Sequence, residues 1–265
     1  MTQDIRIEML GVPIDNLSVE ESLQRIEEFI RSGRVHQHVV VNVDKIVKAQ
    51  RDPRLREIIQ ACDLINVDGQ PVVWMSRWLG CPLKERVNGT DLMMALIKRS
   101  AEKGYRPFFL GATEQIVSRL VQILQAQYPQ LRVAGWRNGY WSADEEPAVV
   151  EQIRRSQADI LFVAISSPKK EIFLGRWKEE LRVPFMMGVG GSFDVAAGLV
   201  KRAPRWMQKA GLEWLYRLLQ EPARMWRRYL VDDLAIVPLF WKEWRRMRGT
   251  RHKMGLSPRS ELTNL

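Results

Sequence analysis

Short apolar runs alternate with longer amphipathic stretches over most of the chain. The runs HVVVNV, LINV, PFFL, DILFVAI and VPFMMGV begin at positions 38, 64, 107, 159 and 183. Continuous apolar runs of this length are typical of parallel strands that are covered on both faces. Helical patterns of about 10 to 15 residues separate them, which favours right-handed crossover connections. The sequence therefore predicts an α/β fold with a Rossmann-like, mostly parallel sheet flanked by helices.

Helix-start signals agree with this pattern. Ser18 with Glu21 and Ser142 with Glu145 have the spacing of capping boxes, and Asp52-Pro53 is typical of a helix start. Helices are expected at 18–31, 55–62, 71–79, 90–103, 113–128, 142–156 and 169–181. Two further strands are expected at 5–10 and 131–136.

The C-terminal quarter of the chain differs from the rest in charge and aromatic content. Positions 201–265 contain 15 Lys and Arg against 6 Asp and Glu, whereas positions 1–200 contain 26 against 25. We therefore expect an α/β body at 1–200, a helical appendage rich in arginine and tryptophan at 201–248, and a flexible tail at 249–265. An anion that binds this protein is expected to meet the appendage.

Composition excludes several classes of protein. With 46% hydrophobic residues the chain can bury a substantial core. The two cysteines, Cys62 and Cys81, and the three histidines form no paired or clustered pattern, so neither a disulfide framework nor a structural metal is expected. No stretch reaches the roughly 18 apolar residues of a membrane span, and no signal-peptide pattern opens the sequence. We expect a cytoplasmic protein, with attachment to a bilayer surface still open.

Polar and glycine residues follow nearly every predicted strand. They occur at 42–44, 68–70, 111–113, 166–171 and 188–192. Ligands of open parallel sheets bind in the crevice beyond the carboxyl ends of the strands. Helix caps and tight turns use the same residue types, so each segment alone is ambiguous. Five such segments in succession favour a binding crevice.

The crevice lacks the common phosphate-binding motifs. Neither GxGxxG after the first strand nor GxxxxGK[ST] occurs, although Gly190 and Gly191 would allow a diphosphate to approach the backbone. Asp68 is the acidic residue best placed for chemistry, because it ends a strand and precedes Gly69. Its carboxylate would accept a proton from an attacking hydroxyl. The alternative is a turn aspartate that bonds to its own backbone.

Seven segments resemble, in order and spacing, the motifs of the WecG/TagA/CpsF family of bacterial glycosyltransferases, also called glycosyltransferase family 26. They are VNVDKIVKAQRDPRL, DLINVDGQPVVWMSRWLG, ERVNGTDLM, FFLGAT, SSPKKEIF, GVGGSFDVAAG and RAPRWMQKAGLEWLYRLLQEPARMWRRY. The resemblance covers about 5–230, and the last two segments are highly specific.

The resemblance implies a function. Such enzymes transfer a sugar with inversion from a UDP-sugar donor to a polyprenyl-diphosphate-linked saccharide, without a required metal or other cofactor. They act at the inner leaflet of the cytoplasmic membrane in the assembly of exopolysaccharide, teichoic acid or enterobacterial common antigen. By resemblance the general base is Asp68, and substrate-binding residues are Asn42, Arg86, Arg217, Arg224, Arg227 and Arg228.

Two positions depart from the family pattern. The family commonly has a threonine where this chain has Val40, and a glutamine where it has Lys170. An ammonium at position 170 would favour a more anionic sugar or phosphate than a neutral amide does. Lys170 is therefore expected to contact substrate, while the identity of the sugar stays open.

The appendage combines cations with tryptophans. Arg224, Arg227 and Arg228 are spaced i, i+3 and i+4, which places them on one helix face, where they bind a diphosphate or remain solvated. Trp241 and Trp244, close to the sequence RRMR, are expected to contact the membrane. At least two of the tryptophans at 206, 214 and 226 are expected to pack as core between appendage and body.

Two other functions compete with glycosyl transfer. A basic, aromatic-rich tail is also compatible with nucleic-acid binding, but no RRM, KH or helix-turn-helix pattern accompanies it, so no nucleic-acid partner is expected. A non-catalytic membrane scaffold is the other alternative, against which the presence of Asn42, Asp68 and Arg86 argues. The sequence is compatible with a monomer and with a homo-oligomer.

Overall fold

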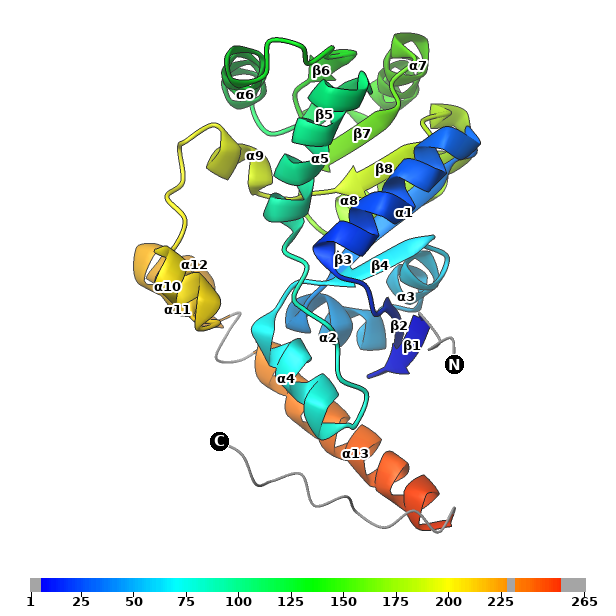
Figure 1. Ribbon diagram of the computed structural model, residues 1–265, viewed down its shortest axis with the longest axis vertical. Coiled ribbons are helices and arrows are strands. Elements are labelled where there is room, and N and C mark those ends of the chain that lie inside the picture. The colour runs from blue at the N-terminus through cyan, green and yellow to red at the C-terminus, as the bar shows by residue number, and fades with distance from the viewer. Residues whose placement is uncertain (1–5, 228–231, 254–265) are drawn as a thin grey trace.

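The computed structural model describes residues 6–227 and 232–253 of the chain, and its centre is one six-stranded sheet (Figure 1). The strand order is β4-β3-β8-β7-β5-β6, and every neighbouring pair is parallel. The strands are β3 (His36–Val41), β4 (Leu64–Val67), β5 (Pro107–Gly111), β6 (Gly135–Arg137), β7 (Ile160–Ala164) and β8 (Phe185–Gly188). The predicted α/β class with a parallel sheet is confirmed.

Helices connect these strands and cover both faces of the sheet. The body helices are α1 (Val19–Ser32), α2 (Val43–Arg51), α3 (Pro53–Gln60), α4 (Gln70–Trp78), α5 (Gly89–Lys103), α6 (Glu114–Gln127), the 3-10 helix η1 (Ala143–Glu145), α7 (Glu146–Ser156), α8 (Lys169–Leu181) and α9 (Ser192–Ala196). Both predicted capping boxes form, since the backbone N–H groups of Ser18 and Ser142 donate to the Glu21 and Glu145 carboxylates at 2.8 Å.

The core consists of two layers, one on each side of the sheet. Phe109 and Phe162 lie on the face that α1, α5, α6 and α9 cover, with their ring centroids 5.6 Å apart. Their strand neighbours Phe108 and Leu161 face α7 and α8 instead. Successive side chains of a strand point to opposite faces, so an uninterrupted apolar run is what a sheet covered on both sides requires.

The first predicted strand does not join this sheet. It is β1 (Arg6–Met9), which pairs antiparallel with β2 (Val12–Asp15) in a separate hairpin. Leu10 and Gly11 connect the two strands with φ of 55° and 75°. Such a two-residue connection joins antiparallel strands, whereas a parallel pairing needs a long crossover. The strand expected at 131–136 is also shorter and later, at Gly135–Arg137.

The C-terminal segment is helical, as predicted. It contains α10 (Arg205–Lys209), α11 (Glu213–Gln220), α12 (Pro222–Arg227), the 3-10 helix η3 (Asp233–Ala235) and α13 (Ile236–Lys253). Figure 1 shows α10–α12 beside the sheet and α13 running past α4. The division at 200 and 248 stays a prediction, because α13 continues to Lys253 and residues 254–265 of the expected tail lie outside the described residues. Within the described helices, none is both long and apolar enough to cross a bilayer.

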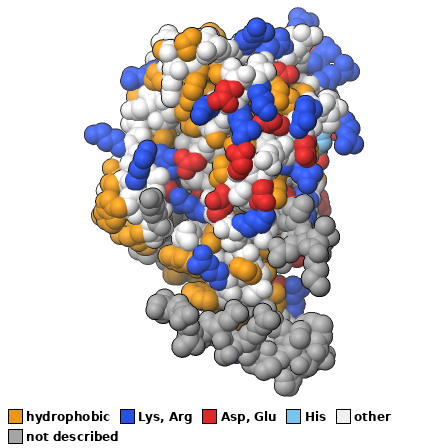
Figure 2. Space-filling model, in the orientation of Figure 1, with side chains coloured by type: hydrophobic (Ala, Val, Ile, Leu, Met, Phe, Trp, Pro, Cys, Tyr) orange, Lys and Arg blue, Asp and Glu red, His pale blue; other side chains and the backbone are white. Residues whose placement is uncertain are grey.

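Three tryptophans of this segment are more exposed than the sequence suggested. Trp206 is 65% exposed, Trp226 51% and Trp214 37%. The expectation that at least two of them pack in the core was therefore wrong, because α10–α12 are short helices that turn these rings outward. Figure 2 shows hydrophobic side chains gathered at the surface over these helices.

Candidate active site

The segments predicted to form a binding crevice meet at the carboxyl ends of β3, β4 and β8. The chain leaves β3 towards β4 on one side, while β8 pairs with β3 on the other, so the strand order reverses here. Asn42 follows β3 and Asp68 follows β4. The backbone N–H of Asp68 donates to the Val41 carbonyl at 2.8 Å. A Cβ on Gly69 would lie 3.7 Å from that of Asn42. The two strand-end residues predicted from topology are thus neighbours.

The Asp68 carboxylate is held by a residue from another loop. The Asn88 amide Nδ2 donates to its two oxygens at 3.2 and 3.3 Å. Asn88 itself is fixed, because its Oδ1 caps α5 by accepting from the Thr90 N–H at 2.9 Å. The bond therefore comes from a residue 20 positions away, and not from the turn's own backbone as the alternative interpretation required.

Burial raises the pKa of Asp68 above its usual value. The positive charges of Arg86 and Arg217 and the Asn88 hydrogen bond oppose this rise, while the negative charge of Glu213 adds to it. A carboxylate with a raised pKa is a stronger base than an ordinary aspartate. The environment of Asp68 is therefore suited to proton abstraction.

The appendage lies directly against the start of α4. Gly211 precedes α11 with φ of +73°, and a Cβ at this position would approach the Gln70 Cγ to 2.5 Å. Only glycine accommodates both the positive φ and this close contact. The turn that begins α11 therefore packs on Gln70, which is two residues after Asp68 in the sequence.

Arginines from body and appendage converge on Glu213, which is buried. Its carboxylate lies 3.3 Å from the Arg86 Nη1, 3.6 Å from the Arg202 Nε and 3.8 Å from the Arg217 Nη2. Arg202 also pairs with Asp91 of α5, with Nη2 at 3.2 Å. Arg86 and Arg217, named only by resemblance, are thereby brought together close to Asp68.

The other predicted arginines belong to α12 or follow it. Arg227 ends α12 with an exposed side chain. Arg224 lies in the same helix, and its side chain is outside the described structure, as is all of Arg228. Their expected diphosphate contacts stay predictions.

Lys170 lies beside the carboxyl end of β8. Its aliphatic chain packs on Gly188, where a Cβ would meet the Lys170 Cδ at 2.8 Å, and its Nζ lies 3.8 Å from the Cβ position of Gly190. Gly191 follows at the start of α9. The predicted residues Lys170, Gly190 and Gly191 therefore lie next to one another in space.

A buried ion cluster supports Lys170. The Glu171 Oε1 lies 2.8 Å from the Lys45 Nζ and 3.4 Å from the Lys170 Nζ. Burial opposes ionisation of Glu171, but the two lysines lower its pKa to about 2. Lys45 also donates to the Val40 carbonyl at 2.7 Å, so the cluster reaches the first position that departs from the family pattern.

Sequence reasoning missed Asn88, Lys45, Arg202 and Glu213. Asn88 and Glu213 both stand inside the quoted segments, ERVNGTDLM and RAPRWMQKAGLEWLYRLLQEPARMWRRY. The available signals were an acid in a strongly basic segment and a lysine at the start of a helix that follows a buried strand. Neither signal shows which distant residue is the partner.

The two tryptophans predicted at a membrane differ in exposure. Trp241 is 49% exposed, whereas Trp244 packs against the core beneath the Arg248 guanidinium, which lies 3.7 Å from its ring centroid. Trp78 of α4, which sequence reasoning did not consider, is 67% exposed, and its ring lies 5.8 Å from that of Phe240 in α13. Exposed indoles of α4 and α13 thus lie near one another.

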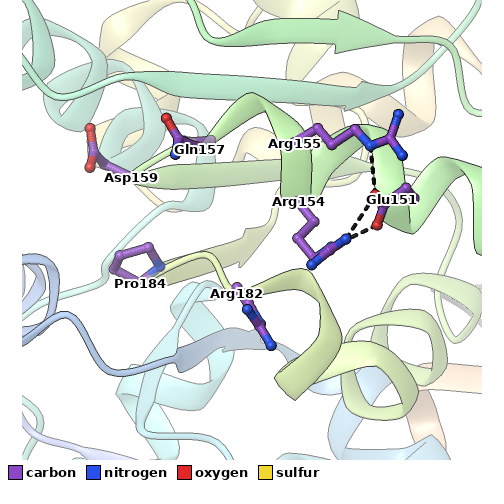
Figure 3. A pocket seen from close by; sticks show the side chains of 8 residues that line it. Glu151, Arg154, Arg155, Gln157, Asp159, Arg182 and Pro184 are labelled. Carbon is purple, nitrogen blue, oxygen red and sulfur yellow. Dashed lines mark hydrogen bonds and ion pairs between the residues drawn. The ribbon is translucent and has the colours of Figure 1, made fainter.

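A separate hollow of about 680 Å³ lies at the opposite edge of the sheet (Figure 3). Residues that precede β7 and β8 line it, together with Arg154 and Arg155. Both arginines pair with Glu151 at 2.6 Å, so this one carboxylate already engages them. The hollow faces the amino ends of the strands, and we do not assign the reaction to it. In residues 6–227 and 232–253, no group of three or more His, Cys, Asp or Glu residues could hold a metal ion.

Comparisons with known proteins agree with the motifs. A sequence profile described as "Glycosyl transferase WecG/TagA/CpsF family" matches residues 7–250. An N-acetylglucosaminyldiphosphoundecaprenol N-acetyl-beta-D-mannosaminyltransferase of Bacillus spizizenii is 36% identical over 192 residues, which cover 72% of this chain and 74% of the relative. A protein of the same name from Bacillus subtilis strain 168 is 35% identical over 221 residues, covering 83% of this chain and 85% of the relative.

Proposed function

The chain belongs to the WecG/TagA/CpsF family and is a glycosyltransferase, and we propose that it transfers a sugar with inversion from a UDP-sugar to a polyprenyl-diphosphate-linked saccharide. The observation that carries this proposal is the convergence of Arg86 and Arg217 on a buried centre close to Asp68. A base and several permanent cations at one sheet edge are what a displacement with a diphosphate leaving group needs.

In this mechanism Asp68 accepts the proton of the acceptor hydroxyl as its oxygen attacks the anomeric carbon. The bond between that carbon and the donor's diphosphate oxygen breaks, and UDP leaves with the electron pair. Arg86 and Arg217, together with Arg224, Arg227 and Arg228, stabilise the leaving diphosphate. A guanidinium pairs with phosphate oxygens through two parallel donors and stays charged at any working pH. The reaction is proposed to need no metal and no other cofactor.

The remaining predicted residues are proposed to hold the donor. Asn42, Gly190 and Gly191 follow the carboxyl ends of β3 and β8, where the donor is proposed to bind. Lys170 lies beside them, and its ammonium would attract a phosphate oxygen or the carboxylate of a uronic acid. We propose that the donated sugar is a hexose, an N-acetylhexosamine or a uronic acid. The transfer is proposed to serve the assembly of a cell-surface polysaccharide.

A donor panel tests the proposed function. The purified full chain is incubated with N-acetylglucosaminyl-diphosphoundecaprenol and, separately, with UDP-N-acetylmannosamine and other UDP-hexoses, UDP-N-acetylhexosamines and UDP-uronic acids, each with and without EDTA. We expect acceptor-dependent UDP release with at least one donor, unchanged by EDTA. The absence of release with every donor would contradict the proposal, and loss of release in EDTA would contradict its metal independence.

Arg217 is a direct test of the proposed cation site. Because Arg217 is proposed to make a charge-assisted contact with the donor diphosphate, Arg217→Gln is expected to lower kcat/KM by about 10- to 100-fold. Half of the Arg217 side chain is exposed, so the substitution should not unfold the body. Steady-state kinetics and thermal melting measure the two effects. Arg155→Gln, an exposed arginine at the opposite edge of the sheet, is the control. Equal kinetics for the two variants would exclude Arg217 from the site.

We further propose that the protein attaches peripherally to the inner leaflet of the cytoplasmic membrane through Trp241 and Trp244. The exposed ring of Trp241 and the cations Lys242 and Arg245 share α13, and Trp78 extends the apolar surface onto α4. Tryptophan settles at headgroup depth, and cations meet anionic lipid. Trp244, which packs beneath Arg248, contributes mainly by fixing the position of α13.

The double variant Trp78→Ala/Trp241→Ala is expected to bind anionic vesicles about tenfold more weakly, since each indole loses buried apolar area. Sedimentation with vesicles that contain phosphatidylglycerol measures this change. Trp136→Ala is the matched control, because Trp136 is 42% exposed on β6, away from α4 and α13. Unchanged sedimentation of the double variant would reject this membrane surface.

A further inference from the structure

Glu213 is a buried carboxylate that three arginines from separate segments share. Arg86 comes from the loop before α5, Arg202 from the segment before α10, and Arg217 from the next turn of α11. Glu213 itself is only 7% exposed. Arg202 also pairs with Asp91, whereas Arg86 and Arg217 share the Glu213 carboxylate. Glu213 therefore joins the body to the appendage at the point where their cations gather.

The contacts around Glu213 are loose. At 3.3, 3.6 and 3.8 Å they are longer than the roughly 2.7–2.9 Å of a tight charge-assisted hydrogen bond. An arginine has five N–H donors, and a long contact to one shared carboxylate commits few of them. The guanidiniums are thus kept close together while donors remain available for an incoming anion. Without the carboxylate, like charges would repel one another and separate.

The same turn fixes the position of Glu213 relative to Asp68. Gly211, two residues before Glu213, packs on Gln70, which is two residues after Asp68. Glu213 thereby stays near enough for its negative charge to raise the pKa of Asp68. Its position is set by backbone packing as well as by the ion pairs.

We propose that Glu213 is a positioning residue, which holds Arg86 and Arg217 beside Asp68 before substrate binds and leaves their donors free for the diphosphate of the donor. This inference rests on the proposed function, because it explains how the arginines of the proposed donor site are positioned before substrate binds. Glu213 does not contact the reacting atoms in this scheme. It acts through the arginines and through the charge that Asp68 senses.

The pH profile separates this role from a purely structural one. The charged groups around Asp68 are Glu213, which raises its pKa, and Arg86 and Arg217, which lower it, while Arg202 also interacts with it electrostatically. Glu213→Gln removes the one negative charge of this set and leaves the three positive charges. Removing this negative charge lowers the pKa of Asp68, so the acid limb of kcat/KM is expected to move to lower pH, and any separation of the arginines from Asp68 would oppose this shift.

The experiment compares Glu213→Gln, Glu213→Asp and the control Glu221→Gln, which alters an exposed acid at the end of α11. Glu213→Gln is expected to weaken UDP binding and kcat/KM by about tenfold, the usual size of coupling between contacting residues, and to shift the acid limb downward. Glu213→Asp keeps the charge but shortens the reach, so it is expected to weaken UDP binding with the acid limb unchanged. Calorimetry with UDP reads the binding without turnover.

Wild-type UDP affinity and an unmoved acid limb in the Gln variant would overturn the inference. If the Gln variant does not fold, the Asp variant carries the test, and wild-type UDP affinity in that variant would overturn the inference equally. The proposed function fails separately, when the wild-type protein itself transfers no sugar from any donor. In that case the UDP affinities still decide whether Glu213 positions the arginines.

Discussion

Asp68→Asn is expected to lower kcat by about 10²- to 10⁴-fold, which is the usual contribution of one general base. An asparagine has nearly the same shape and still accepts a hydrogen bond from the Asn88 amide, so the loop should keep its conformation. The loss then reflects the missing carboxylate, which is the proposed proton acceptor and also a negative charge beside Arg86 and Arg217. Turnover with a saturating UDP-sugar measures kcat, and UDP binding together with thermal melting shows that the site and the fold persist.

The pH profile of kcat/KM of the wild-type enzyme should also have an acid limb that reports the protonation of Asp68. Burial raises the pKa of Asp68, so kcat/KM is expected to fall as pH decreases through a value above that of an ordinary aspartate. This limb should disappear from the residual activity of Asp68→Asn. Near-normal turnover of the variant, or an unchanged limb, would assign the base to another residue.

Glu171→Gln is expected to destabilise the protein by about 3–5 kcal/mol, because it leaves two buried ammonium groups without their shared carboxylate. Lys45 and Lys170 both lie within 3.4 Å of Glu171, and all three side chains are buried. Urea unfolding followed by circular dichroism measures the change in the free energy of unfolding. Glu180→Gln, an exposed acid on the same helix, is the control and should change that free energy by less than about 0.5 kcal/mol.

The pH dependence of stability follows from the same carboxylate. The pKa of Glu171 is about 2 in the folded state and 4.5 as a reference value. The stability that it contributes is therefore fully present above pH 4.5 and is lost as pH falls towards 2. The Gln variant should lack this part of the acid sensitivity. Equal stability of variant and wild type at neutral pH would show that the cluster is not structurally important.

The body of this protein was largely predictable because local rules determine it. The apolar runs, the capping boxes at Ser18 and Ser142 and the expectation of ligands beyond the strand ends all depend on a few adjacent residues. Asn42 and Asp68 could be proposed on these grounds, and the structure places them side by side. The exception at the N-terminus also has a local cause, since Leu10-Gly11 adopts a tight turn that the apolar pattern did not reveal.

The rest of the site depends on contacts between segments distant in sequence. Arg86 and Glu213 are 127 positions apart, and the packing of Gly211 on Gln70 and the pairing of Arg202 with Asp91 help to bring their segments together. Arg86 and Arg217 were therefore available from family resemblance alone. The carboxylate that organises them, and Asn88 beside Asp68, could not be recognised without the structure. The exposure of Trp206 and Trp226 is likewise set by how short helices pack.

The identity of the product tests most directly whether this protein is an inverting glycosyltransferase with Asp68 as its base. The full chain is incubated with the UDP-sugar that the donor panel selects and a polyprenyl-diphosphate-linked acceptor; mass spectrometry of the extracted lipid gives the added mass, and NMR of the product gives its anomeric configuration. We expect that the acceptor lipid gains the mass of one sugar, in the β configuration from an α-linked donor, and that Asp68→Asn gives almost none of this product. Sugar transferred with retention, or equal product from Asp68→Asn, would contradict it.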